Sequence, residues 1–162
     1  MLTQFKQFIA DVREARIPSW LFWLIVISAS IGFLDAGYLS IQHAMSGLGG
    51  GGVNCVVGAS GSCNIVLDSI YARVAGIPLA YIGLLYYTTI LVLIVHMRFK
   101  RNVHVWWVLR GIIVCGFIAS VYFVYLQLVV LRTICPYCML SALASATMFA
   151  GVVSHHMKKQ LK

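Results

Sequence analysis

The chain has 162 residues, of which 61% are hydrophobic and 10% charged, with a mean hydropathy of +0.92 and a formal net charge of +8. A soluble domain of this length has too little interior to bury so much apolar surface, so an ordinary soluble globular protein is excluded. The basic residues fall into three short clusters beside apolar runs, which argues against a nucleic-acid-binding surface.

Four apolar runs follow one another along the chain, and a membrane-spanning helix needs about 20 such residues. Inside lipid no water satisfies the backbone, so spanning segments are helices or closed barrels, and these runs are too long and continuous for barrel strands. The sequence therefore predicts an all-α integral membrane protein, a four-helix bundle. The predicted helices cover Trp20–His43, Ile77–Met97, Val103–Leu131 and Tyr137–Val153.

The domain organisation follows from these runs. Residues 1–18 are predicted to form an amphipathic cytoplasmic lead-in, residues 19–157 a single transmembrane domain, and residues 158–162 a cytoplasmic tail. The first run is longer than the apolar core of a signal peptide and lacks a clear cleavage site, so we interpret it as a helix of the bundle.

The distribution of basic residues predicts the orientation of the bundle, because Lys and Arg in short loops favour the cytoplasmic side. In an alternating four-helix topology, nine of the twelve Lys and Arg residues lie on one side. This side is expected to be cytoplasmic and to hold both termini. The nine residues are Lys6, Arg13, Arg16, Arg98, Lys100, Arg101, Lys158, Lys159 and Lys162.

Residues 44–76 form the one long hydrophilic connection, and the same topology makes this loop extracytoplasmic. Its glycine-rich stretch, residues 47–52, is either a flexible tether or a plain surface linker. Further on, apolar residues recur at three- and four-residue steps, which predicts a short amphipathic helix lying on the membrane surface. The residues with this spacing are Cys63, Val66, Leu67, Ile70 and Val74.

Four of the five cysteines form two close pairs, Cys55 with Cys63 in the loop and Cys135 with Cys138 at the start of the fourth run. The predicted topology places both pairs where disulfides form and persist. Pro136 favours the first turn of a helix, so Cys135 is expected at the N-cap or first position, where the helix dipole stabilises a thiolate. Two dithiol pairs can exchange an electron pair, which indicates a membrane thiol–disulfide redox enzyme.

Two other interpretations of the cysteines stay open. One is a non-enzymatic membrane protein with structural disulfides, although a bond within a CxxC closes almost no loop and stabilises little. The other is a zinc site, although the spacing of Cys55 and Cys63 fits the usual short metal-binding knuckles poorly. We expect no metal. Cys115, in the middle of the third run, is interpreted as an inert packing residue.

Four motifs occur in a fixed order along the chain: the Cys55/Cys63 pair, residues 64–69 (NIVLDS), residues 76–80 (GIPLA) and the final CxxC, Cys135–Cys138. This order resembles the vitamin K epoxide reductase family, specifically its bacterial homologues, from about residue 20 to residue 155. The DsbB-type family also has four helices and two cysteine pairs, but its CxxC comes first in the chain, whereas here it comes last.

The resemblance implies a quinone-dependent thiol:disulfide oxidoreductase of the bacterial inner (plasma) membrane that supports disulfide bond formation. A reduced extracytoplasmic thioredoxin-fold protein of the DsbA type would attack the loop disulfide at Cys55. Cys63 would then pass the electrons to Cys135. Cys138 would reduce a quinone, ubiquinone or menaquinone, from the membrane pool. Because the chain ends at Lys162, we expect the partner to be a separate protein.

The quinone pocket is expected one or two helical turns below Cys138, between the helices. Tyr86 and Gln127 are candidates for hydrogen bonds to the quinone carbonyls, and Ser69 matches a family position near the active site. For each residue alone, ordinary helix packing is at least as good an interpretation. The candidate quinone-binding residues are Ser69, Leu79, Ile82, Tyr86, Phe123 and Gln127.

Two further residues bear on the reaction. Asp35 is the only acidic residue inside a predicted membrane helix, and it serves either proton supply or a structural hydrogen bond to a neighbouring helix. Family members of vertebrates that reduce the epoxide carry a tyrosine four residues after the last CxxC cysteine, and this chain has Ala142 there. We therefore expect quinone reduction without strong epoxide reduction.

Overall fold

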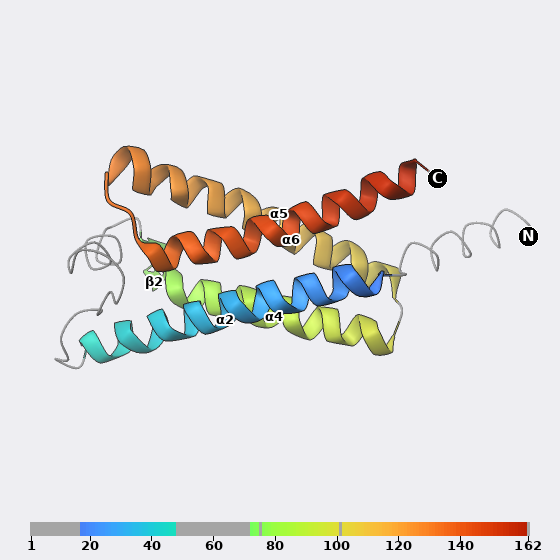
Figure 1. Ribbon diagram of the computed structural model, residues 1–162. Helices are drawn as coiled ribbons and strands as arrows, with labels where there is room; N and C mark the ends of the chain where they lie inside the picture. The colour runs from blue at the N-terminus through green and yellow to red at the C-terminus, as the bar shows by residue number, and fades with distance from the viewer. Residues whose placement is uncertain (1–16, 48–71, 75, 101, 162) are drawn as a thin grey trace, which may run out of the picture.

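The computed structural model describes residues 17–47, 72–74, 76–100 and 102–161. Four long helices dominate this part of the chain (Figure 1). Each is long and apolar enough to cross a membrane, so the prediction of an all-α four-helix membrane protein is confirmed. The helices are α2 (Ser19–Gly47), α4 (Leu79–Phe99), α5 (Val103–Tyr125) and α6 (Pro136–Gln160).

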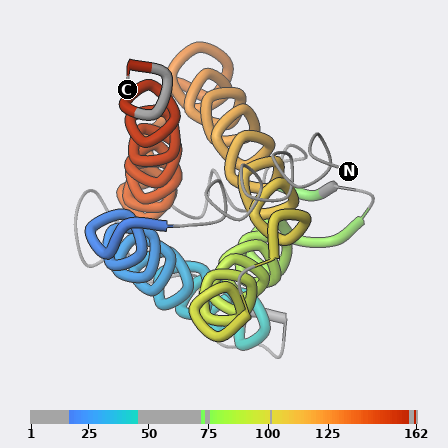
Figure 2. Tube along the Cα trace, turned by 90° about the vertical axis from the view of Figure 1, so that its right-hand side faces the viewer, coloured from blue at the N-terminus to red at the C-terminus, as the bar shows by residue number. Residues whose placement is uncertain are grey.

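The four helices form a ring in the order α2, α4, α5, α6 (Figure 2). Helix α2 packs against α4 and α6, and α5 packs against the same two helices from the other side. Successive helices run in opposite directions (Figure 1). The start of α6, which carries the CxxC, therefore lies at the same end as the start of α4 and the end of α5. We call this the CxxC end and the opposite one the terminal end.

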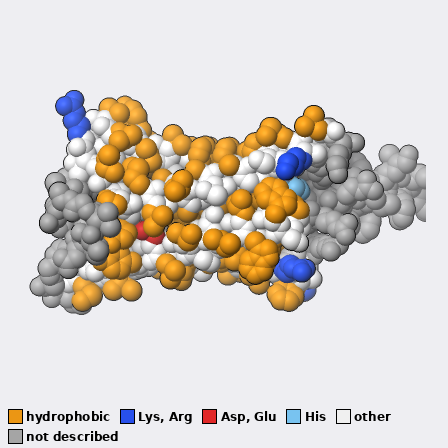
Figure 3. Space-filling view, viewed as in Figure 1, with side chains coloured by type: hydrophobic (Ala, Val, Ile, Leu, Met, Phe, Trp, Pro, Cys, Tyr) orange, Lys and Arg blue, Asp and Glu red, His pale blue; other side chains and the backbone are white. Residues whose placement is uncertain are grey.

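On the face shown in Figure 3, hydrophobic side chains are spread along the whole length of the bundle. Trp23, Leu34, Leu85 and Leu143 are each at least 60% exposed, which is consistent with lipid as the solvent of this surface. Hydroxyl groups on the helices do not break the apolar layer, because several donate to the carbonyl oxygen four residues earlier. Thr88, Thr89 and Thr147 make this bond.

Most of the densely packed core lies towards the terminal end of the bundle. Its centre is Tyr87 of α4, which is 2% exposed and whose hydroxyl donates to the carbonyl oxygen of Ser141 in α6 at 2.9 Å. The Tyr87 ring packs directly on Gly32 of α2, where a Cβ atom would overlap it. The fully buried side chains of this core are Leu21, Ile25, Ile90, Ile94, Trp106, Leu109, Ile113 and Met148.

A short hairpin precedes α4. Strand β1 (Arg73–Val74) pairs antiparallel with β2 (Ile77–Pro78), and Gly76 supplies a φ of 82° in the turn between them. The predicted surface helix through Val74 is therefore wrong at its C-terminal end. There the β-branched residues form a pair of short extended strands instead of a helix. The rest of that predicted helix, residues 63–71, lies outside the described residues.

Three helix boundaries differ from those predicted from hydropathy. Helix α4 begins at Leu79, because Ile77 and Pro78 belong to the strand and Pro78 is the N-cap. Helices α2 and α6 continue to Gly47 and Gln160, several residues past the apolar runs. Hydropathy detects only the part of a helix that lipid surrounds, so polar turns beyond it are missed.

Replacement of Gly32 by alanine is expected to destabilise the bundle. The new Cβ would overlap the ring of Tyr87, which cannot swing away because it is buried and bonded to Ser141. We expect the free energy of unfolding to fall by about 1–3 kcal/mol, the usual cost of overpacking. A lower thermal unfolding temperature in detergent would report the change.

Gly37→Ala, in the same helix, is the matched control. Its Cβ would meet only an ordinary contact, Leu84 Cδ1 at 3.8 Å, and alanine favours a helix over glycine by about 1 kcal/mol. The control is expected to keep or raise the unfolding temperature. Equal losses in both variants would contradict the packing described for Tyr87.

Candidate active site

The CxxC opens helix α6, as predicted from Pro136. Cys135 is the N-cap, with an extended backbone (φ −94°, ψ 114°), and Pro136 occupies the first turn. The backbone N–H of Cys138 donates to Cys135 Sγ at 3.5 Å, so the first thiol takes the place of a capping side chain. Cys135 is completely buried, whereas Cys138 is partly exposed.

The surroundings of Cys135 favour its thiolate. A hydrogen bond from the Cys138 side chain lowers the pKa of Cys135 to about 7, and the backbone N–H groups of Tyr137 and Cys138 act in the same direction. Burial of the sulfur opposes this lowering. Cys135 thus has the character of the reactive member of the pair, since the thiolate is the nucleophile in thiol–disulfide exchange.

A π-helical turn at the end of the third span holds Cys135 in place. The predicted helix Val103–Leu131 is α-helical only to Tyr125, and residues Leu126–Val130 form the π-helix η2. Within it Gln127 is buried, and its side-chain Oε1 accepts the backbone N–H of Cys135 at 2.9 Å. The carbonyl oxygen of Gln127 also accepts the N–H of Thr133, at 3.1 Å. Such π-turns are common at functional sites.

A partly open cavity of about 640 Å³ begins beside the CxxC and extends along α5 as far as Val108, in the terminal half of that helix. Cys138 lies in its wall, while Cys135 does not line it. Its volume and its mainly apolar lining are those of a small-molecule pocket. Five of the six predicted quinone-binding residues line this cavity together with Cys138, and the sixth, Ser69, lies outside the described residues. The five are Leu79, Ile82, Tyr86, Phe123 and Gln127.

The loop cysteines Cys55 and Cys63 also lie outside the described residues, so the predicted contact between the two cysteine pairs stays a prediction. Ala72, just before β1, is buried and contributes to the cavity wall. The chain that follows the loop therefore reaches the cavity beside the CxxC.

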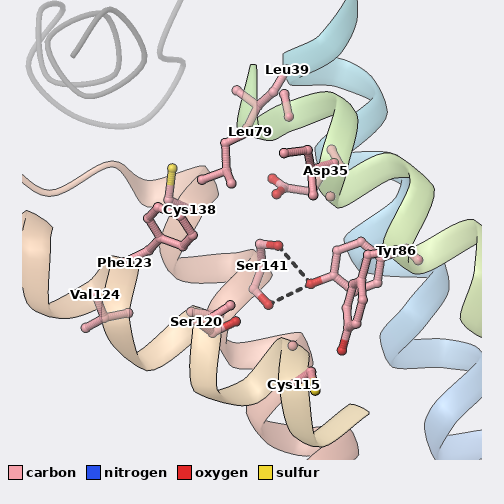
Figure 4. Close-up of a pocket in the computed structure, with 18 of the residues that line it drawn as sticks. Asp35, Leu39, Leu79, Tyr86, Cys115, Ser120, Phe123, Val124, Cys138 and Ser141 are labelled. Carbon is pink, nitrogen blue, oxygen red and sulfur yellow. Dashed lines mark hydrogen bonds between the residues drawn. The ribbon is translucent and has the colours of Figure 1, made fainter. Parts of the chain in front are cut away.

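Polar groups are few in the cavity, and Figure 4 shows how several of them face it. Asp35 from α2 and Ser141 from α6 line it, and Ser141 Oγ lies 2.8 Å from the Tyr87 hydroxyl. Within the described residues neither carboxylate oxygen of Asp35 has a hydrogen-bond partner. The prediction that Asp35 forms a structural hydrogen bond to a neighbouring helix is therefore wrong among the described residues.

Two lining residues were not found by sequence reasoning. Cys115, interpreted as an inert packing residue, is exposed and lines the cavity. Ser141, one turn after Cys138, also lines it and bridges to Tyr87. For Ser141 a signal was present, since residues three or four apart share a helix face and Ser141 is three residues from Cys138. The position of Cys115 depends on how α5 is rotated, which its uniformly apolar sequence does not specify.

A dithiol that caps a membrane helix, with its second cysteine in the wall of an apolar cavity between the helices, defines a membrane thiol–disulfide oxidoreductase. The chain matches the family model of the Vitamin K epoxide reductase family over residues 23–153 and belongs to that family. The matched region includes α4, α5, most of α2 and α6, the residues that line the cavity, and the CxxC. No curated protein matches the chain.

The lowered pKa of Cys135 is open to a direct test in the reduced protein. In a variant with Cys55, Cys63 and Cys115 replaced by serine, the ultraviolet absorbance of the thiolate should rise with a first midpoint near pH 7. Below that pH the pair is a dithiol, and above it Cys135 is ionised. Further replacement of Cys138 by alanine removes the hydrogen bond and should raise the midpoint. A first midpoint at the ordinary thiol value, about 8.5, would contradict this description of the site.

Proposed function

We propose that this protein is a quinone-dependent thiol oxidase of the bacterial inner membrane. It oxidises a separate extracytoplasmic thioredoxin-fold protein of the DsbA type and so supports disulfide bond formation. The observation that carries the proposal is the placement of the CxxC: Cys138 lies in the wall of the cavity, and Cys135 lies beside it at the cap of α6. One dithiol thus connects an electron acceptor inside the bundle with a thiol donor outside it.

The cavity fits a quinone ring by its chemistry. Leu79, Ile82 and Phe123 supply apolar walls, and the hydroxyl of Tyr86 supplies a polar group. Gln127 lines the same space, but its Oε1 is engaged by the N–H of Cys135, so only its amide NH₂ group is left to donate to a carbonyl. When bound there, a ubiquinone or menaquinone from the membrane pool supplies an acceptor of two electrons and two protons.

The electrons reach the CxxC through the loop cysteines in this proposal. A thiolate of the partner attacks the Cys55–Cys63 disulfide at Cys55, and a mixed disulfide forms. The second partner thiol resolves it, which leaves the partner oxidised and the loop pair reduced. Cys63 then attacks a Cys135–Cys138 disulfide at Cys135, and the sulfur of Cys138 leaves as the thiolate. Resolution by Cys55 restores the loop disulfide and leaves the CxxC as a dithiol beside the cavity.

The orientation is proposed from charge. Among the described residues, Arg98 near the end of α4 and Lys158 near the end of α6 lie at the terminal end. Most Lys and Arg atoms visible in Figure 3 lie at that end too. The positive-inside rule favours the terminal end as cytoplasmic, with both termini there. The CxxC end then faces the compartment in which disulfides persist.

Quinone reduction by the purified protein tests the proposal. With a reduced thioredoxin-fold donor and either ubiquinone or menaquinone, the wild type should turn over. Cys138→Ala and Cys55→Ala should each abolish turnover, because each removes one sulfur of the relay. Cys55→Ala should still accept electrons from a small dithiol, which bypasses the loop pair. Thr147→Ala is the matched control on α6, because its hydroxyl is exposed and bonds only its own helix.

A different set of results would contradict the proposal. A wild-type protein that reduces neither quinone would overturn the proposed function. If both cysteine pairs then prove permanently oxidised, the protein is a membrane protein with structural disulfides, and if zinc co-purifies with reduced thiols, it is a metal protein.

Epoxide reduction is expected to be weak. Ala142, four residues after Cys138, lines the cavity with a methyl group, so this position offers no hydroxyl to the epoxide oxygen. We expect purified protein to reduce vitamin K epoxide much more slowly than quinone under the same dithiol supply. Equal rates for the two substrates would show that this position does not decide the specificity.

A further inference from the structure

Among the described residues, Asp35 has no hydrogen-bond partner that would explain its place in a membrane helix. It lies in α2, is 6% exposed, and lines the cavity. Figure 4 shows its carboxyl group directed into the cavity, towards the side on which Cys138 and Ser141 lie. In the part of the chain that is described, neither of its oxygens accepts or donates a hydrogen bond. A buried polar group without a partner costs about 1–3 kcal/mol, which points to a function.

The surroundings of Asp35 favour its neutral, protonated form. No Lys, Arg or His is among the described residues that line the cavity, so no cation there offsets a carboxylate charge. An isolated ionised carboxylate is very costly in an apolar medium, and such a group takes up a proton instead. The described titratable side chains that share the cavity with Asp35 are Tyr86 and Tyr87 from α4, Cys115 from α5 and Cys138 from α6.

The carboxyl group shares the cavity with one member of the redox-active pair. Asp35, Tyr87 and Cys138 all line it, and Figure 4 shows the carboxyl group on the side opposite Cys138. Tyr87 is a poor alternative proton source, because its hydroxyl is already bonded to Ser141 and a phenol is a weaker acid than a carboxylic acid. Gln127, which lines the same cavity, carries no acidic proton.

We propose that Asp35 is the proton carrier of this cavity. It donates a proton to the electron acceptor bound beside Cys138 and recovers one from the CxxC dithiol. This assignment rests on the proposed function, since it needs an acceptor of the quinone class in the cavity.

When the Cys135–Cys138 bond forms from the dithiol, the two S–H bonds break and release two electrons and two protons. Both electrons pass to the quinone, and its two oxygen atoms each gain a proton. One of these protons comes from the carboxyl group of Asp35, which takes up a thiol proton in its place and ends unchanged. The other passes from the second thiol.

Three substitutions at one position separate proton transfer from binding. Asp35→Asn keeps the size and a hydrogen-bond donor but has no transferable proton. Single-turnover oxidation of the reduced CxxC by quinone should slow by about 100-fold or more, the usual range for loss of a general acid. Quinone affinity should stay close to that of the wild type. Asp35→Glu should recover a large part of the rate, and Asp35→Leu should be as slow as Asp35→Asn.

Ser40→Ala is the control for the helix. Ser40 lies in the same helix, is buried, and bonds the carbonyl oxygen of Ala36 without lining the cavity. Its rate should match the wild type. A wild-type rate in Asp35→Asn would overturn the proposal, because Asp35 would then serve at most as a hydrogen-bond donor. Loss of quinone affinity that accounts for the whole rate loss would also overturn it.

Infrared difference spectroscopy gives a readout that needs no quinone. When a chemical thiol oxidant closes the Cys135–Cys138 bond, the carbonyl stretching band of a protonated carboxylic acid should shift. The shift should be absent in Asp35→Asn and present in Ser40→Ala. A spectrum without such a band in the wild type would contradict the proposal.

The two experiments distinguish failure of the proposed function from failure of Asp35 as the proton carrier. If the wild type does not reduce quinone but the infrared band shifts with oxidation, Asp35 responds to the dithiol and the acceptor has been misassigned, so the carrier role in quinone reduction falls. If quinone reduction is normal and Asp35→Asn is unimpaired, the enzyme assignment stands and the proton carrier is wrong.

Discussion

The hydrogen bond from the backbone N–H of Cys135 to the side chain of Gln127 is the contact on which the site depends. It joins the π-helical end of the third span to the first residue of the fourth, across a chain reversal in which Arg132 adopts a left-handed φ of 49°. The amide of Cys135 would otherwise be a buried donor without a partner. Because this donor is satisfied from η2, Cys135 can keep the extended backbone of an N-cap and direct its sulfur to the N–H of Cys138.

The two ends of the bundle differ in how densely their interior is packed. In the terminal half, large side chains fill the interior to the density of an ordinary core, and small residues such as Gly32 let the helices approach. At the CxxC end the same four helices leave a partly open cavity, which continues along α5 towards the terminal end. The bond between Tyr87 and Ser141 crosses the ring between two helices that are not neighbours, and both residues also line the cavity.

Much of this arrangement could be predicted from the sequence, because the features concerned are local or one-dimensional. Long apolar runs predict the four helices, and Pro136 predicts the start of α6. Leu79 and Phe123 were predicted for the pocket from their depth in the membrane below Cys138. What was missed depends on tertiary contacts. The π-turn at Gln127 exists because its side chain serves Cys135, a residue eight positions later. The strand at Val74 requires Gly76 and its pairing with Ile77. The exposure of Cys115 depends on the rotation of a helix that is apolar all round.

The position of the reacting groups has a consequence for the energetics of the membrane. Cys138 and Asp35 line the part of the cavity nearer the CxxC end, and the fully buried side chains of Ile94, Trp106 and Leu109, which do not line it, occupy the interior at the terminal end. In the proposed reaction, the protons released by the thiols and those taken up by the acceptor are therefore exchanged on the same side of these buried side chains. The protein would then move no net charge across the bilayer during turnover. Its reaction would not depend on the membrane potential, and it would neither build up nor use the proton gradient.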